Sequence, residues 1–126
     1  MSMRSPLSRV RGLGSAKEGL THWLHQRITA VALVPLTIWL LASMIALGGA
    51  DYVAFKEWLA VPCNTSLMIL LLILVFHHAQ LGLQVVIEDY VHGALKVVGI
   101  VGVKLLALLL GVFSVVAVLR TAFVGG

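Results

Sequence analysis

The chain has 126 residues, of which 60% are hydrophobic and 11% are charged, and its formal net charge is +4. Its mean hydropathy of +1.06 excludes a water-soluble domain of this size. The basic residues are scattered and accompany no nucleic-acid-binding motif, which argues against a nucleic-acid partner. We therefore expect an all-α membrane protein with a single domain over residues 1–126.

The amino-terminal segment, residues 1–25, is a basic leader. This segment and the start of the next one contribute five basic side chains: Arg4, Arg9, Arg11, Lys17 and Arg27. The loop at about 51–65 carries one, Lys56. Because basic residues stay on the cytoplasmic side when loops are short, we expect a cytoplasmic amino terminus and, after three spans, a periplasmic carboxyl terminus.

Three apolar segments follow the leader, at about residues 26–50, 65–90 and 97–121. Each is as long as the about 20 residues that a helix needs to cross the hydrocarbon of a bilayer. The first is longer than the apolar core of a secretory signal peptide, which has about 7–15 residues, so we expect it to remain in the mature protein. The single cysteine, Cys63, cannot form an intrachain disulfide.

The predicted helices carry small residues at four-residue spacing. Ala42, Ala46 and Ala50 form such a series in the first span, and Ala107 with Gly111 form one in the third. Small residues at this spacing let helices approach closely in a membrane. Because three spans make a thin bundle, we expect the chain to pack with a partner subunit in the membrane.

Two adjacent histidines, His77 and His78, lie in the middle of the second span. They are about 10 residues, or about 15 Å, from either end of the run. An ionisable residue at that depth normally faces a protein interior and has a partner there. One interpretation is that both imidazoles only hydrogen-bond neighbouring helices, and the other is that one of them binds a ligand.

Helical spacing favours His78 as the ligand-binding histidine. It shares one face with Gly82, Val85 and Asp89, because offsets of four, seven and eleven residues return close to the same angle. Gly82 would leave room for a flat macrocycle whose iron takes a neutral imidazole nitrogen. His77 lies on a different face of the helix, which is more crowded and more polar than the face of His78. Zinc is disfavoured, since neither histidine has a second ligand four residues later.

Two segments of the chain resemble a known family. The stretch HAQLGLQVVIEDYVHG, from His78 to Gly93, is similar to the H-x(10)-D-Y segment of the small hydrophobic membrane anchor of succinate dehydrogenase, respiratory complex II. The stretch GSAKEGLTHWLHQRITAVAL, from Gly14 to Leu33, is similar to the start of that anchor in its alphaproteobacterial and mitochondrial-like type. The resemblance implies a multi-pass protein of the bacterial inner membrane.

The resemblance also implies roles for four residues. His78 matches an axial ligand of haem b, and therefore of the haem iron, whose second ligand comes from the companion membrane anchor of the complex. Tyr90 matches a tyrosine that hydrogen-bonds ubiquinone, and Asp89 matches the aspartate beside it. Arg27 matches an arginine near the haem propionates and the quinone pocket. The residues alone leave His77 open as the ligand.

The implied function is that of a membrane anchor without catalytic residues of its own. It would contact membrane lipid, hold the flavoprotein and iron–sulfur subunits, share haem b with the companion anchor and help to form the ubiquinone site. Two alternatives remain. One is the anchor of a fumarate reductase, and the other is a small proton-conducting membrane protein in which the histidines and Glu88 or Asp89 form a relay.

Overall fold

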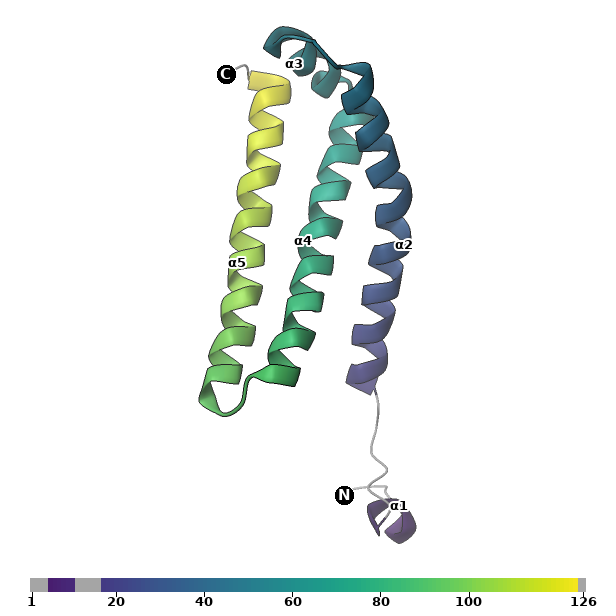
Figure 1. The fold of residues 1–126 in the computed structure, drawn as a ribbon, viewed down its shortest axis with the longest axis vertical. Helices are drawn as coiled ribbons and strands as arrows, with labels where there is room; N and C mark the ends of the chain where they lie inside the picture. Colours follow the sequence, from purple (N-terminus) through teal and green to yellow (C-terminus); the bar gives the residue numbers. More distant parts are fainter. Residues whose placement is uncertain (1–4, 11–16, 125–126) are drawn as a thin grey trace.

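The computed structural model describes residues 5–10 and 17–124. Three long helices lie side by side, with α4 between the other two (Figure 1): α2 (Lys17–Ala46), α4 (Pro62–Tyr90) and α5 (Ala94–Leu119). The shorter elements are α1 (Pro6–Val10), α3 (Tyr52–Ala60) and the π-helical end η1 (Arg120–Val124). The described residues therefore confirm the predicted all-α class.

Within the described part of the chain, three segments are long and apolar enough to cross a membrane: Gly19–Ala46, Pro62–Tyr90 and Ala94–Val124. These segments agree in number and approximate position with the three predicted spans. The most apolar stretches of these segments bury 11%, 17% and 0% of their residues within the chain. Because so little of each is covered by its neighbours, the outer faces of all three helices are left for lipid or for another protein of the membrane.

The ends of the helices differ from those of the expected spans. α2 begins at Lys17, within the segment expected as a leader, and ends at Ala46 rather than near residue 50. It stops before Gly49, whose φ of 82° lies in the left-handed region that commonly ends helices. α4 and α5 begin at Pro62 and Ala94, each slightly earlier than expected. Hydropathy locates the apolar part of a helix, whereas capping and turn residues decide its ends.

A short helix, α3, occupies the segment that was expected to be a loop between the first two spans. The carboxylate of Asp51 caps it by accepting a 2.9 Å hydrogen bond from the N–H of Ala54. Trp58 of α3 stacks on Trp39 of α2 with 5.7 Å between the ring centroids. α3 lies across the end of the bundle where α2 ends and α4 begins, beside η1 (Figure 1), and thereby ties these elements together.

Replacing Asp51 by alanine is expected to destabilise α3 by about 1 kcal/mol, because the first turn loses its side-chain acceptor. Hydrogen exchange of the backbone amides of residues 52–56, followed by mass spectrometry, should become faster. Asp51→Asn keeps an acceptor at the cap and is the matched control, which should exchange like the wild type. Equal exchange in Asp51→Ala and the wild type would show that this cap does not hold α3.

Glycines mark the contacts of α4 with both of its neighbours. A Cβ atom at Gly82 would lie 3.6 Å from Nε2 of Gln26 on α2. A Cβ atom at Gly111 of α5 would lie 3.6 Å from the ring of Phe76 on α4. The small residue predicted to permit close packing in the third span is therefore at a helix–helix contact.

Candidate functional site

The side chain of His78 is directed from the middle of α4 toward α2. Its Nδ1 lies 2.9 Å from Oγ1 of Thr29, a residue that is only 4% exposed. The same hydroxyl lies 2.7 Å from the carbonyl oxygen of His25, one turn earlier on α2. A chain of polar contacts therefore joins the two helices at this level of the bundle.

The Thr29 hydroxyl has a single proton to donate, and its neighbours indicate where that proton goes. The carbonyl oxygens of His25 and Gln26, at 2.7 and 3.1 Å, can only accept hydrogen bonds. When the hydroxyl donates to a carbonyl, its oxygen accepts a hydrogen bond from Nδ1–H of His78. The lone pair of the imidazole is then on Nε2, which forms no hydrogen bond to a residue in the described part of the chain. This arrangement suits ligation of a metal through Nε2.

An open hollow of about 410 Å³ lies beside His78. The rest of its lining comes from α2: Ala30, Leu33, Val34, Thr37 and Ile38. Because α2 and α4 are antiparallel (Figure 1), these residues lie between the level of His78 and the α3 end of the bundle. Gly82 instead faces Gln26. The space beside His78 therefore lies on its α3 side, not over Gly82 as helical spacing predicted.

His77 has different surroundings from its neighbour. Its Nε2 lies 3.4 Å from Nδ1 of His25, and the two ring centroids are 5.5 Å apart. It also lines a groove of about 600 Å³ between α4 and α5, in which Gln80 and Lys104 are the other polar residues. The two adjacent histidines thus differ in partner: another imidazole for His77, and a buried hydroxyl for His78.

Few side chains that could bind a metal ion lie near these histidines. Among residues 5–10 and 17–124, no three His, Cys, Asp or Glu side chains are grouped so that they could hold a metal ion. An iron bound to one imidazole of this chain therefore needs its remaining ligands from a macrocycle and from another protein chain.

A line of three polar side chains runs along α4 from the middle of the bundle toward its Tyr90 end. Nε2 of Gln80 donates to Oε1 of Gln84 at 3.0 Å, and Nε2 of Gln84 donates to Oε1 of Glu88 at 2.8 Å. Gln80 is only 8% exposed. Because carboxamides do not titrate near neutral pH, Glu88 is the sole titratable member of this line. That composition disfavours a proton relay along it.

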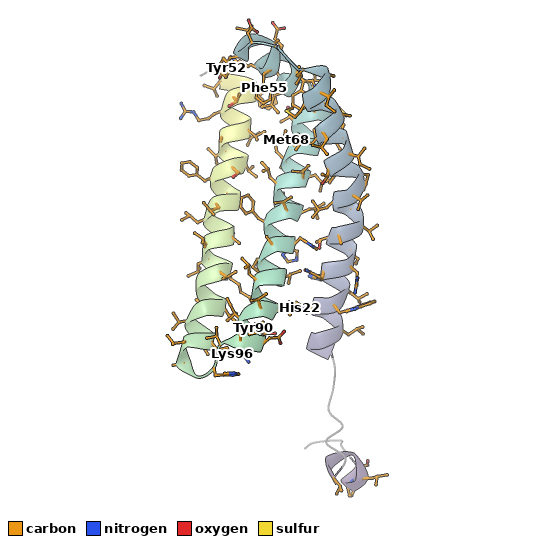
Figure 2. All side chains as sticks on the ribbon, in the orientation of Figure 1. His22, Tyr52, Phe55, Met68, Tyr90 and Lys96 are labelled. Carbon is orange, nitrogen blue, oxygen red and sulfur yellow. The ribbon has the colours of Figure 1, made fainter. Side chains whose placement is uncertain are left out.

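Asp89 and Tyr90 are the last residues of α4, and both are exposed. Figure 2 shows Tyr90 at the same end of the bundle as His22 and Lys96. Because α4 is continuous, Asp89 lies on the face of His78 and about 17 Å along the axis from it, whereas Tyr90 is turned away by about 120°. The structure therefore separates the predicted quinone residues from His78 along the helix.

Arg27 does not face His78 within this chain. Its side chain is exposed, and its Cζ atom lies 5.6 Å from the centroid of the Trp23 ring. Arg27 lies two residues before Thr29, which places the two side chains about 200° apart around the helix axis. Arg27 therefore points away from the side of α2 that contacts α4. A group bound by Arg27 would have to lie on that outer face.

Sequence reasoning did not single out Thr29 or Gln26. His22, Gln26 and Thr29 follow one another at offsets of four and three residues and form a polar face of α2. This helical spacing could have revealed the face from the sequence. Nε2 of His22 and Oε1 of Gln26 are buried without a hydrogen-bond partner in the part of the chain that is described. This face of α2 thus has hydrogen-bonding capacity beyond what its contact with α4 uses.

Comparison with known proteins gives a consistent family. The chain matches the model of the succinate dehydrogenase/fumarate reductase transmembrane subunit over residues 1–119. It is 40% identical to the succinate dehydrogenase hydrophobic membrane anchor subunit of Rickettsia bellii, over 91% of this chain and 93% of the relative. Its identity to the protein of the same name from Rickettsia prowazekii is 30%, over the same shares of the two chains.

A more distant relative is the succinate dehydrogenase membrane anchor subunit of Reclinomonas americana, with 29% identity over 73% of this chain and 80% of the relative. No solved structure matches the chain significantly. The family match, over residues 1–119, contains the first two segments that can cross a membrane and all but the last five residues of the third. The chain is thus a multi-pass membrane protein that belongs to the family of succinate dehydrogenase/fumarate reductase transmembrane subunits.

Proposed function

We propose that this chain anchors a succinate:ubiquinone oxidoreductase in the membrane and supplies His78 as one axial ligand of a haem b that it shares with a companion membrane anchor. The observation that carries the haem assignment is the contact between Nδ1 of His78 and the buried hydroxyl of Thr29. It leaves Nε2 free to ligate, beside a hollow that is open at the surface of the helix pair.

The residues present fit a haem. The hollow beside His78 is lined by aliphatic side chains of α2, including Leu33, Val34 and Ile38, which suit the apolar face of a porphyrin and exclude water from the iron ligand. A haem bound here would store and pass on single electrons. The hollow is open on one side, so the companion anchor is needed to cover the haem and to provide the other axial ligand.

The quinone site is proposed at the Asp89–Tyr90 end of α4. Reduction of ubiquinone consumes two electrons and two protons. Tyr90 is 80% exposed, and its phenol can donate a hydrogen bond to a quinone carbonyl. Asp89, the preceding residue, is also exposed, so its carboxylate can exchange protons with water. Arg27 would offer its guanidinium to a haem propionate or to the quinone vicinity on the outer face of α2.

We place the amino terminus in the cytoplasm of a bacterium, the carboxyl terminus in the periplasm and the three spans in the inner membrane. The basic leader supports this orientation. The start of α2 and the turn between α4 and α5 lie at the same end of the bundle (Figure 1). The flavoprotein and iron–sulfur subunits would dock on that end, which also carries Tyr90, while lipid and the companion anchor cover the exposed apolar faces.

Removal of this chain from its native cell is expected to release succinate dehydrogenase from the membrane. Dehydrogenase activity with a water-soluble dye should move from the membrane fraction to the soluble fraction, and succinate-dependent ubiquinone reduction should fall to background. Re-expression of the wild-type chain is the control and should restore both. Dehydrogenase that stays on the membrane and still reduces ubiquinone without this chain would refute the anchor assignment.

The anchor of a fumarate reductase is the second candidate, because the family that the chain matches covers both enzymes. The same architecture would then pass electrons from a quinol to fumarate. The curated relatives carry the name of succinate dehydrogenase, which favours the oxidation of succinate. The two candidates are separated by comparing, in the purified complex, the rate of succinate oxidation by a quinone with the rate of fumarate reduction by a quinol.

A further inference from the structure

Thr29 is a buried polar residue in the middle of α2, and it contacts the histidine that we assign to the haem. Its side chain is 4% exposed, and its hydroxyl oxygen lies 2.9 Å from Nδ1 of His78. We propose that Thr29 is a positioning residue that fixes the tautomer and the ring orientation of His78, so that Nε2 faces the iron. This inference rests on the proposed haem function.

The backbone of α2 holds the Thr29 hydroxyl in place. Oγ1 is 2.7 Å from the carbonyl oxygen of His25 and 3.1 Å from that of Gln26, the contacts by which a helical threonine hydroxyl donates to the preceding turn. The branched side chain is restricted to few rotamers in a helix. The lone pair of Oγ1 therefore points toward α4 from a fixed position, where it accepts a hydrogen bond from Nδ1–H of His78.

The same contact distinguishes His78 from His77. The partner of His77 is the imidazole of His25, which can donate or accept and therefore selects neither tautomer. The partner of His78 is a hydroxyl whose only proton is engaged by backbone carbonyls. Second-sphere acceptors of this kind orient a metal-ligating histidine and raise its basicity. Thr29 thus gives one of two adjacent histidines the tautomer that ligation through Nε2 requires.

The test compares Thr29→Val, which keeps the branched shape and removes the hydroxyl, with Thr29→Ser, which keeps the hydroxyl. Both are made in the intact, purified complex, and the readouts are haem content per complex and the midpoint potential of the haem. We expect Thr29→Val to weaken haem retention by about 10-fold or more. Loss of the acceptor makes the imidazole less basic, so any haem retained should have a higher midpoint potential. Thr29→Ser should keep both values near those of the wild type.

Ser114→Ala is the matched control. Ser114 makes the same kind of bond, 2.7 Å to the carbonyl oxygen of Leu110 one turn earlier, but it lies on α5 away from His78. Haem content and potential should be unchanged in this variant. If Thr29→Val does not assemble, Thr29→Ala removes the hydroxyl with a smaller side chain and takes its place.

Wild-type haem content and potential in Thr29→Val or Thr29→Ala would overturn the positioning role while leaving the haem assignment intact. Loss of haem in Thr29→Val, Thr29→Ser and Ser114→Ala alike would also overturn it, because the effect would then reflect general destabilisation. A wild-type complex that contains no haem would instead refute the proposed haem function, so the two failures are distinguishable.

Discussion

A complex that carries His78→Ala is expected to lose its b-type haem absorption, retaining about a tenth of the wild-type signal or less. The substitution removes an axial ligand itself, and loss of even a supporting residue around a metal commonly costs about 10- to 100-fold in affinity. The measurement is the visible difference spectrum of the dithionite-reduced and oxidised complex, normalised to the flavin content of the same sample.

His77→Ala is the matched control for this experiment. It removes an imidazole at nearly the same depth in the membrane, and the contact that it loses is with the ring of His25. The haem signal should therefore persist. If His77→Ala abolishes the signal and His78→Ala preserves it, then the ligand is His77, and the role inferred for Thr29 fails with the assignment of His78.

Replacing Tyr90 by phenylalanine is expected to lower succinate-dependent ubiquinone reduction by about 100-fold, the lower end of what a positioned proton donor contributes. The ring remains, and only the hydroxyl that would donate to the quinone carbonyl is removed. Reduction of a water-soluble dye should be unaffected, because it does not use the quinone site. The haem spectrum should also be unchanged, since Tyr90 lies about 18 Å along α4 from His78.

The chain provides a suitable control in its other tyrosine, Tyr52. This residue is also largely exposed, at 57%, but it lies at the opposite end of the bundle (Figure 2). Tyr52→Phe should retain normal ubiquinone reduction. Full activity in Tyr90→Phe would exclude its phenol from the quinone site, and equal loss in both variants would indicate an effect on the fold rather than on the site.

The three spans could be predicted from the sequence because apolar runs of membrane length have few alternative structures. α3 was missed because the charge and length of its segment were considered without its capping signal. Asp51 lies directly before the helix and accepts from Ala54, a pattern that the sequence contains. The early start of α2 was missed for another reason, since hydropathy does not report where a helix continues outside the hydrocarbon.

Part of the candidate site also followed from helical spacing. The continuous α4 places Asp89 on the face of His78, as predicted. The partner of His78 could not be derived, because it depends on how α2 is shifted along α4, and hydropathy does not encode that register. The same register places Gln26 opposite Gly82. The hollow therefore lies on the α3 side of His78, whereas helical spacing predicted it over Gly82.

The most direct test of the account is a reduced-minus-oxidised visible spectrum of the complex, purified in mild detergent from its native membrane through a tag on this chain, with identification of the proteins that co-purify. We predict a b-type haem band together with a flavoprotein, an iron–sulfur protein and a second membrane anchor. Purified chain that shows no haem band and brings none of these partners would contradict the account.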